Sequence, residues 1–199
     1  MKRDVDFLFE IGALRHQPRM WHRFLGSDVA SITEHHFRVV WLALIIAARE
    51  KKGNVEKIIK MALVHDIPES RTGDADYMSR QYVTRDEDKA LEHMLDKTSI
   101  KRPFVAAWKE YGKHRSIESK IVKDADNLDF DIELREQGIK GSKLEKNWRE
   151  TRDKITRKRF YTEAARQLYD EIMTAEPSDW HINSPYNRIN GGDWKSKDG

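Results

Sequence analysis

Apolar residues recur at intervals of three or four along most of this chain, which is the period of an amphipathic α-helix. The clearest case extends from about Thr33 to Lys52 and stops at Gly53. It follows a capping box, in which Ser31 and Glu34 can each bond the backbone amide of the other. The alternating pattern of a β-strand is scarce, so the sequence predicts an all-α fold.

Further helices are predicted between residues that favour turns or helix starts. They span about 6–15, 54–66, 86–95 and 104–111. Another helix is capped by Ser116. A final long helix is predicted from Trp148 to Thr174.

Two stretches lack a helical period. Gly73 and its neighbouring aspartates predict a loop over 69–85, and the prolines and glycines of 176–199 predict an irregular tail. No linker divides the chain, so residues 1–199 are expected to form a single domain with a C-terminal helical extension at about 145–175.

Charge and hydropathy narrow the possible partners. The net charge is +3, from 37 basic and 34 acidic residues, and such an even balance gives no reason to expect a nucleic-acid partner. Basic residues are dense in 140–159, but acidic residues are interleaved among them and predict a solvated face. The longest apolar run, Val39 to Ala48, is too short to cross a membrane. We therefore expect a cytoplasmic protein without a membrane partner.

The chain contains no cysteine. This excludes disulfides, thiolate zinc sites and cysteine nucleophiles. A metal ion would have to be held by histidines and carboxylates, a set that suits Mn, Fe, Co, Ni, Mg or Zn.

Four such residues stand at helix starts, helix ends or on a helix with an apolar face: His35, His65, Asp66 and Asp126. Singly, each has an ordinary explanation, since a lone histidine is usually hydrogen-bonded in the core and a lone aspartate is usually on the surface. Together, two imidazoles and two carboxylates form a mixed set that leaves coordination positions open for water and a phosphate oxygen.

The order H…HD…D on successive helices resembles the HD superfamily of metal-dependent phosphohydrolases. Two segments resemble motifs of this family: SITEH from Ser31 and ALVHDIPE from Ala62. Three more resemble its 5′-deoxynucleotidase branch: TGD from Thr72, WKEY from Trp108 and ESKIVKDADNL from Glu118. The resemblance covers about residues 10–135 and implies an HD-domain helical bundle.

The resemblance also implies roles for particular residues. One divalent metal ion would be bound by His35, His65, Asp66 and Asp126. Glu69 would be a general acid or base, and Asp74 a second catalytic carboxylate near the scissile bond.

Upstream, the segment PRMW resembles a family segment whose arginine and tryptophan approach the nucleotide, although the spacing here is one residue shorter. Arg19 would contact a phosphate and Trp21 would offer a stacking surface. The alternative for Trp21 is a core residue at a helix entry.

Several neighbouring residues receive other predictions. His36 is expected to be structural and Asp124 to be exposed, while Lys123 is left open between a phosphate contact and a salt bridge. Three arginines near the TGD turn could clamp a substrate phosphate or be solvated, and solvation is favoured: Arg71, Arg80 and Arg85.

The sequence thus favours a phosphomonoesterase that acts on (deoxy)nucleoside 5′-monophosphates. Two alternatives stay open: a phosphodiesterase or nucleoside triphosphate hydrolase of the same superfamily, and a non-catalytic nucleotide-binding module. A homodimer is expected for this branch. The tail aromatics Trp180, Tyr186 and Trp194 are expected to pack on the domain or on a second subunit.

Overall fold

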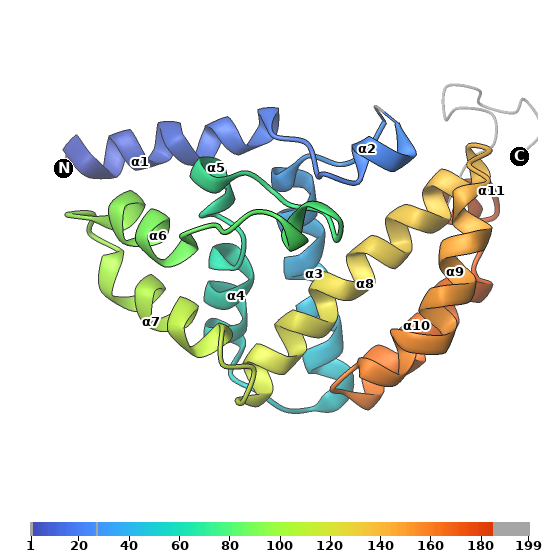
Figure 1. The fold of residues 1–199 in the computed structure, drawn as a ribbon. Coiled ribbons are helices and arrows are strands. Elements are labelled where there is room, and N and C mark those ends of the chain that lie inside the picture. Colours follow the sequence, from blue (N-terminus) through green and yellow to red (C-terminus); the bar gives the residue numbers. More distant parts are fainter. Residues whose placement is uncertain (1, 27, 185–199) are drawn as a thin grey trace, which may run out of the picture.

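The computed structural model describes residues 2–26 and 28–184, and these form helices joined by turns and irregular segments, with no strand among them (Figure 1). The helices are α1 Lys2–Ala13, α2 His22–Leu25, α3 Ile32–Glu50, α4 Val55–Val64, α5 Glu69–Thr72, α6 Glu87–Leu95, α7 Lys101–Tyr111, α8 Ile117–Ile139, α9 Leu144–Ile155, α10 Glu163–Thr174 and α11 Asp179–Ile182. The all-α prediction is confirmed.

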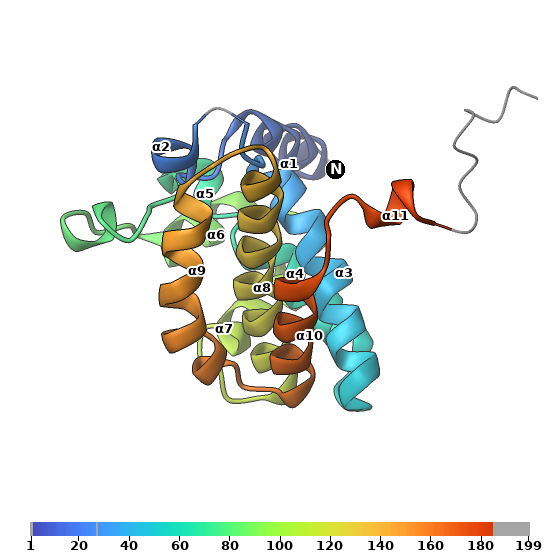
Figure 2. The ribbon, with the colours of Figure 1, turned by 90° about the vertical axis from the view of Figure 1, so that its right-hand side faces the viewer.

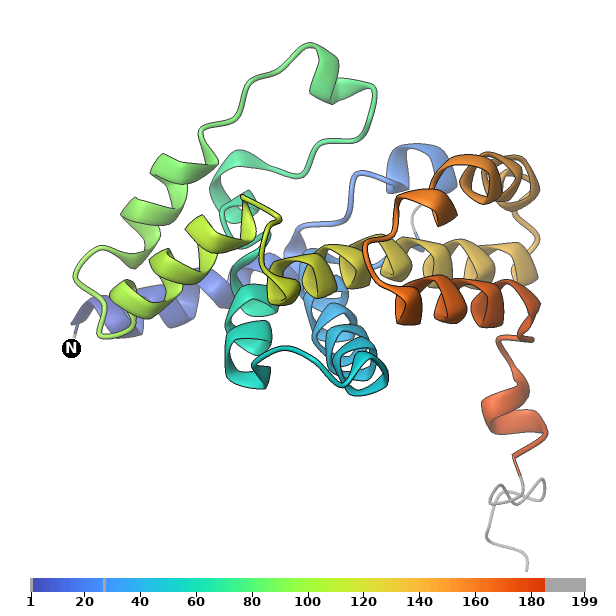
Figure 3. The same cartoon turned by 90° about the horizontal axis from the view of Figure 1, so that it is seen from below.

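The two longest helices, α3 and α8, cross at the centre of the molecule, and α4 packs against both (Figures 1 and 3). Their facing side chains form the core, including Ile46 of α3, Met61 of α4 and Leu128 of α8, all fully buried. Helices α6 and α7 lie on one side of this centre, and α9 and α10 lie on the other (Figures 1 and 3). Both α9 and α10 run alongside α8 (Figure 2).

Local signals begin α3 where the sequence predicted. The Ser31 hydroxyl accepts a hydrogen bond from the Glu34 amide at 3.3 Å, and the Glu34 carboxylate accepts one from the Ser31 amide at 2.6 Å. This capping box places His35 in the first turn of the helix.

The single long helix predicted from Trp148 to Thr174 is wrong. Helix α9 ends at Ile155, a 3₁₀ turn covers Arg157–Arg159, and α10 starts after Thr162, whose side chain caps it. The chain reverses between the two helices, so that both pack against α8.

Asp124 binds the segment in which the chain reverses. The prediction that Asp124 is exposed is also wrong. Its side chain is fully buried and accepts hydrogen bonds from the backbone amides of Tyr161 (2.9 Å) and Thr162 (2.8 Å) and from the Thr162 hydroxyl (2.7 Å). Asp124 does point away from Asp126, as their spacing requires, but the C-terminal helices cover that side of α8.

The predicted loop over 69–85 contains the short helix α5 and a 3₁₀ turn at Ser79–Gln81. The predicted irregular tail contains α11, in which Trp180 is 78% exposed and so does not pack on the domain. Tyr186 and Trp194 lie outside the described residues. No helix in the described ranges has the length and apolar character to span a membrane.

Candidate metal centre and substrate cavity

The two histidines predicted as metal ligands meet between α3 and the end of α4. The Nε2 atoms of His35 and His65 lie 3.1 Å apart, and both rings are buried. His65 follows the last residue of α4, where its Nδ1 donates a hydrogen bond to the carbonyl of Ala62 at 2.8 Å. Its Nε2 is therefore left facing His35.

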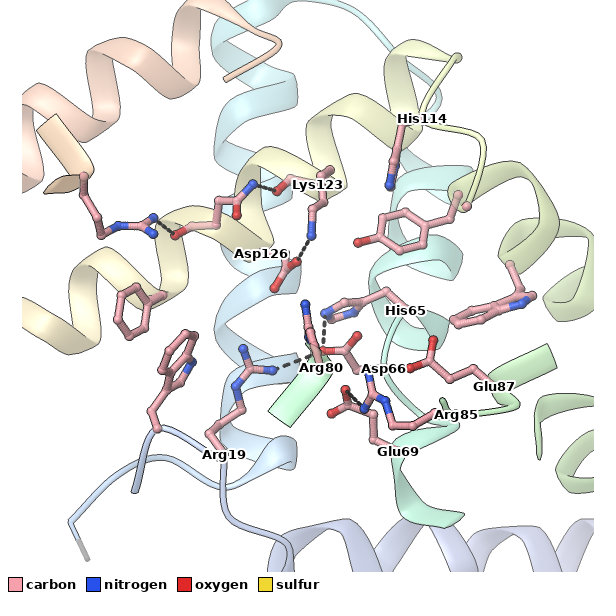
Figure 4. Close-up of a pocket in the computed structure, with 17 residues that line it drawn as sticks. Arg19, His65, Asp66, Glu69, Arg80, Arg85, Glu87, His114, Lys123 and Asp126 are labelled. Carbon is pink, nitrogen blue, oxygen red and sulfur yellow. Dashed lines mark hydrogen bonds and ion pairs between the residues drawn. The ribbon is translucent and has the colours of Figure 1, made fainter. Parts of the chain in front are cut away.

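Two carboxylates complete the group (Figure 4). The His35 Nε2 atom is 3.4 Å from an oxygen of Asp66 and 3.4 Å from an oxygen of Asp126. One nitrogen or oxygen from each of the four residues lies within 4.8 Å of all the others. This mixed set of ligand atoms fits a divalent ion such as Mn²⁺, Fe²⁺, Co²⁺, Ni²⁺, Mg²⁺ or Zn²⁺, and it includes each of the four predicted residues.

Cations pair with both carboxylates of the group. Arg19 lies 3.1 Å from Asp66, and Lys123 lies 2.7 Å from Asp126. Burial opposes the ionisation of Asp66, but His65, His35 and Arg19 together lower its pKa below the ordinary value. The lowered pKa favours the ionised form of Asp66, which is the form that binds a metal ion. The sequence left Lys123 open between a phosphate contact and a salt bridge, and the structure contains the salt bridge.

Glu69, the first residue of α5, is 3% exposed and lines the same cavity as Asp66. One of its oxygens accepts a hydrogen bond from Arg85 at 3.1 Å, and the other is buried without a partner among the described residues. Burial, with the negative charges of Asp66 and Asp74, raises the pKa of Glu69 to about 9. The raised pKa favours the protonated form of Glu69, which can donate a proton.

Asp74 lies behind this cavity and not among the residues that line it. Its carboxylate accepts hydrogen bonds from the backbone amides of Met20 (2.8 Å) and Ala75 (2.7 Å) and lies 3.9 Å from Nε of Arg19. It therefore ties the segment that carries Arg19 to the TGD turn.

Trp21 has features of both roles that the sequence left open, a stacking surface for the nucleotide and a core residue at a helix entry. Its ring packs 4.3 Å from Phe130 and 5.7 Å from Trp148 between centroids, and it is partly exposed and lines the cavity. Its indole nitrogen is buried without a hydrogen-bond partner within the described part of the chain.

The cavity has a volume of about 450 Å³ and is lined by three of the four ligands: His65, Asp66 and Asp126. Arg19 lies on one side of the ligands, and Glu87 and His114 lie on the other (Figure 4). This volume suits a small molecule.

The three arginines expected to be solvated have different surroundings. Arg71 pairs with Glu10 at 2.6 Å, away from the cavity. Arg85 is mostly buried and pairs with both Glu69 (3.1 Å) and Glu87 (2.7 Å), so its predicted solvation is wrong. Arg80 lines the cavity and is exposed, as predicted.

Other cavity residues were missed. Arg152, assigned to the solvated face over 140–159, lines the cavity and forms an ion pair with the buried Asp131. His114, which has no ligand spacing in the sequence, lines the cavity but lies outside the ligand group. Trp108 and Tyr111 also line it, and the WKEY motif contained the signal for both.

His36 is structural, as predicted. It is buried, and its Nδ1 bonds the carbonyl of Ile32 at 2.8 Å. Burial lowers the pKa of His36 to about 3, so this ring is neutral.

Comparison with known proteins agrees with this geometry. A family model described as HD domain matches residues 11–173. The 5′-deoxynucleotidase HDDC2 of Danio rerio is 32% identical over 139 residues, which cover 66% of this chain and 68% of the relative. The human protein of that name is 27% identical over 138 residues, covering 66% of this chain and 67% of the relative.

Solved structures share the fold. A conserved hypothetical protein from Pyrococcus furiosus superposes with a TM-score of 0.73 at 25% identity, covering 86% of this chain and 99% of that protein. A protein from Pyrococcus horikoshii gives a TM-score of 0.69 at 26% identity, with 84% and 97% covered. As the sequence motifs predicted, this chain belongs to the HD domain family and is similar to 5′-deoxynucleotidases.

Proposed function

We propose that this chain is a metal-dependent phosphohydrolase that removes the phosphate from (deoxy)nucleoside 5′-monophosphates. The observation that carries the proposal is the position of Glu69. This buried carboxyl lines a cavity of about 450 Å³ beside the four converging ligands, and burial raises its pKa. The names of similar proteins support the choice of substrate.

The reaction divides between the metal and the side chains around it. A divalent ion held by His35, His65, Asp66 and Asp126 would offset charge on the phosphoryl oxygens and make water a better nucleophile. Arg19 is buried beside Asp66, where its guanidinium can orient the phosphate.

Glu69 handles the proton. As water adds to phosphorus and the bond to the 5′ oxygen breaks, Glu69 donates its proton to that oxygen, which leaves as the nucleoside hydroxyl. The carboxylate then takes a proton from the added water, which restores its starting state. For Asp74, the contacts with Met20 and Arg19 support a role in holding Arg19, and its direct catalytic role stays a prediction.

Trp21 is proposed to contact the nucleoside. Its packing against Phe130 holds the ring in place at the cavity wall, where a base or sugar can lie against it. A rigid aromatic surface of this kind favours nucleotides over small inorganic phosphates.

Arg80 is proposed as a further contact with the substrate phosphate. Five cations line the cavity: Arg19, Arg80, Arg85, Lys123 and Arg152. All of them except Arg80 pair with a carboxylate of the described chain. Arg80 can therefore bind an anion without giving up an ion pair.

Replacing Arg80 by glutamine is expected to raise KM for a nucleotide about tenfold, equivalent to about 1.4 kcal/mol, with kcat nearly unchanged. The reason is that the Arg80 charge would bind the substrate phosphate equally in the ground state and in the transition state, so its loss changes KM and not kcat. Steady-state kinetics would measure this. The matched control is Arg71→Gln, which removes a guanidinium paired with Glu10 outside the cavity and should leave KM unchanged. An unchanged KM in Arg80→Gln would remove Arg80 from the substrate site.

The proposed activity is tested by metal analysis together with a substrate panel. Purified protein loaded with each of several divalent metals would be given deoxynucleoside and nucleoside monophosphates, triphosphates and a phosphodiester. Release of inorganic phosphate from monophosphates is expected. Pyrophosphate or a nucleotide as product would favour the triphosphate hydrolase or phosphodiesterase alternatives, and no turnover with any metal would favour the non-catalytic module.

A homodimer stays a prediction, as does the cytoplasmic location. One surface supports the dimer: Phe37, Trp41 and Ile45 are exposed at four-residue intervals on α3 and so share one face of the helix. An exposed apolar stripe of this kind is typical of a protein contact.

A further inference from the structure

Asp129 is a buried carboxylate that contacts His35 on the side of its ring facing away from the other proposed ligands. It lies one turn after Asp126 on α8, and its Oδ2 is 2.6 Å from Nδ1 of His35. We propose that Asp129, held by Arg38, is a positioning residue that orients His35 and thereby sets the affinity of the centre for its metal ion.

The two nitrogens of His35 face different partners. Nδ1 meets the Asp129 carboxylate, which can only accept when ionised, so Nδ1 carries the hydrogen. Nε2 faces the carboxylates of Asp66 and Asp126 at 3.4 Å each. The hydrogen bond to Asp129 thus selects the ring orientation and tautomer in which the Nε2 lone pair is directed into the centre.

His65 is oriented in a different way. Its Nδ1 donates to the backbone carbonyl of Ala62, which its own helix supplies. The Nδ1 atom of His35 is therefore bonded to a charged side chain, whereas that of His65 is bonded to a neutral carbonyl. A carboxylate partner makes the ring a more basic ligand than a carbonyl does. Asp129 therefore affects both the position and the strength of one ligand.

Arg38 makes a buried carboxylate tolerable at this position. Its Nε donates to the second oxygen of Asp129 at 2.5 Å, and its Nη1 donates to Glu136 at 2.8 Å. Without Arg38, the carboxylate would be buried with less compensation. The contacts run from the metal centre through Asp129 and Arg38 to Glu136, whose side chain is 40% exposed.

The inference rests on the metal centre of the proposed function, but not on the proposed substrate. Three variants test these contacts in order of increasing distance from His35: Asp129→Asn, Arg38→Met and Glu136→Gln. Mn²⁺ binding would be measured by isothermal titration calorimetry on metal-free protein whose folding is checked by circular dichroism. We expect Asp129→Asn to weaken Mn²⁺ binding about 10- to 100-fold, the range for residues that orient metal ligands.

Arg38→Met should weaken binding less than Asp129→Asn, and Glu136→Gln should match the wild type. Thermal unfolding with and without Mn²⁺ separates positioning from structural support: a structural role would lower both midpoints equally, whereas positioning reduces the stabilisation that Mn²⁺ adds.

The inference would be overturned if Asp129→Asn folds and binds Mn²⁺ with wild-type affinity. It would also be overturned if the unfolding midpoints with and without Mn²⁺ fall equally. If Asp129→Asn does not fold, Arg38→Met decides, because Arg38 is partly exposed; weaker Mn²⁺ binding supports the inference and unchanged binding overturns it. Because none of these measurements needs turnover, failure of the proposed phosphatase activity would be seen separately in the substrate panel.

Discussion

Replacing Glu69 by glutamine is expected to lower kcat by about 10²- to 10⁴-fold, the usual effect of removing a general acid. Glutamine has nearly the same shape, and its carbonyl can still accept the hydrogen bond from Arg85. It has no acidic proton to give to the leaving 5′ oxygen. Phosphate release from a deoxynucleoside monophosphate at saturating metal and substrate would measure the effect.

Metal binding should survive this change, since Glu69 is outside the group of four ligands. The matched control is Glu87→Gln, because Glu87 lines the same cavity and pairs with the same arginine, Arg85, at 2.7 Å. We expect less than a tenfold loss of kcat in the control. Equal losses in both variants would mean that the Arg85 ion pairs, and not a proton from Glu69, are what the reaction needs.

Replacing His65 by alanine is expected to weaken metal binding by more than about 100-fold, because residues that only orient a ligand already cost 10- to 100-fold. The ring is buried, and its Nε2 is one of the four convergent ligand atoms. Calorimetric titration with Mn²⁺ and metal analysis of the purified variant would measure the loss, and phosphatase activity should fall with it.

His114→Gln is the control for a histidine of the same cavity. Its side chain lines the cavity but is not in the ligand group, so its metal affinity should equal that of the wild type. If His65→Ala kept its metal, the ion would have to bind elsewhere, and the proposed centre would be wrong.

The convergence of the predicted ligands was accessible from the sequence because local signals place most of them. The Ser31–Glu34 capping box puts His35 in the first turn of α3, and the end of α4 releases His65 and Asp66 together. Such signals depend on a few neighbouring residues, whose types can be seen directly in the sequence. Asp126 was a candidate because it lies on a helix with an apolar face, and the resemblance to a known family then supported all four residues as one set.

The helix predicted from Trp148 to Thr174 shows where local signals are not enough. Both α9 and α10 have helical composition, so the periodicity continues across the break. The reversal between them depends on Asp124, which is 38 residues from Thr162. Because the spacing along the chain carries no sign of this contact, the sequence alone could not position the break.

For charged side chains too, local sequence signals identified some roles, and contacts between distant residues determined the others. The helical class, the family and the residues proposed as metal ligands could all be inferred from the sequence, because helix periods, caps and short motifs depend on neighbouring residues. Three contacts became visible only in the folded chain: Arg85 donates to Glu69, Arg152 lines the cavity, and Asp129 bonds His35 across 94 residues. The physical reason is that a charge is buried only when a partner compensates it, and that partner is brought close by packing of helices far apart in the chain.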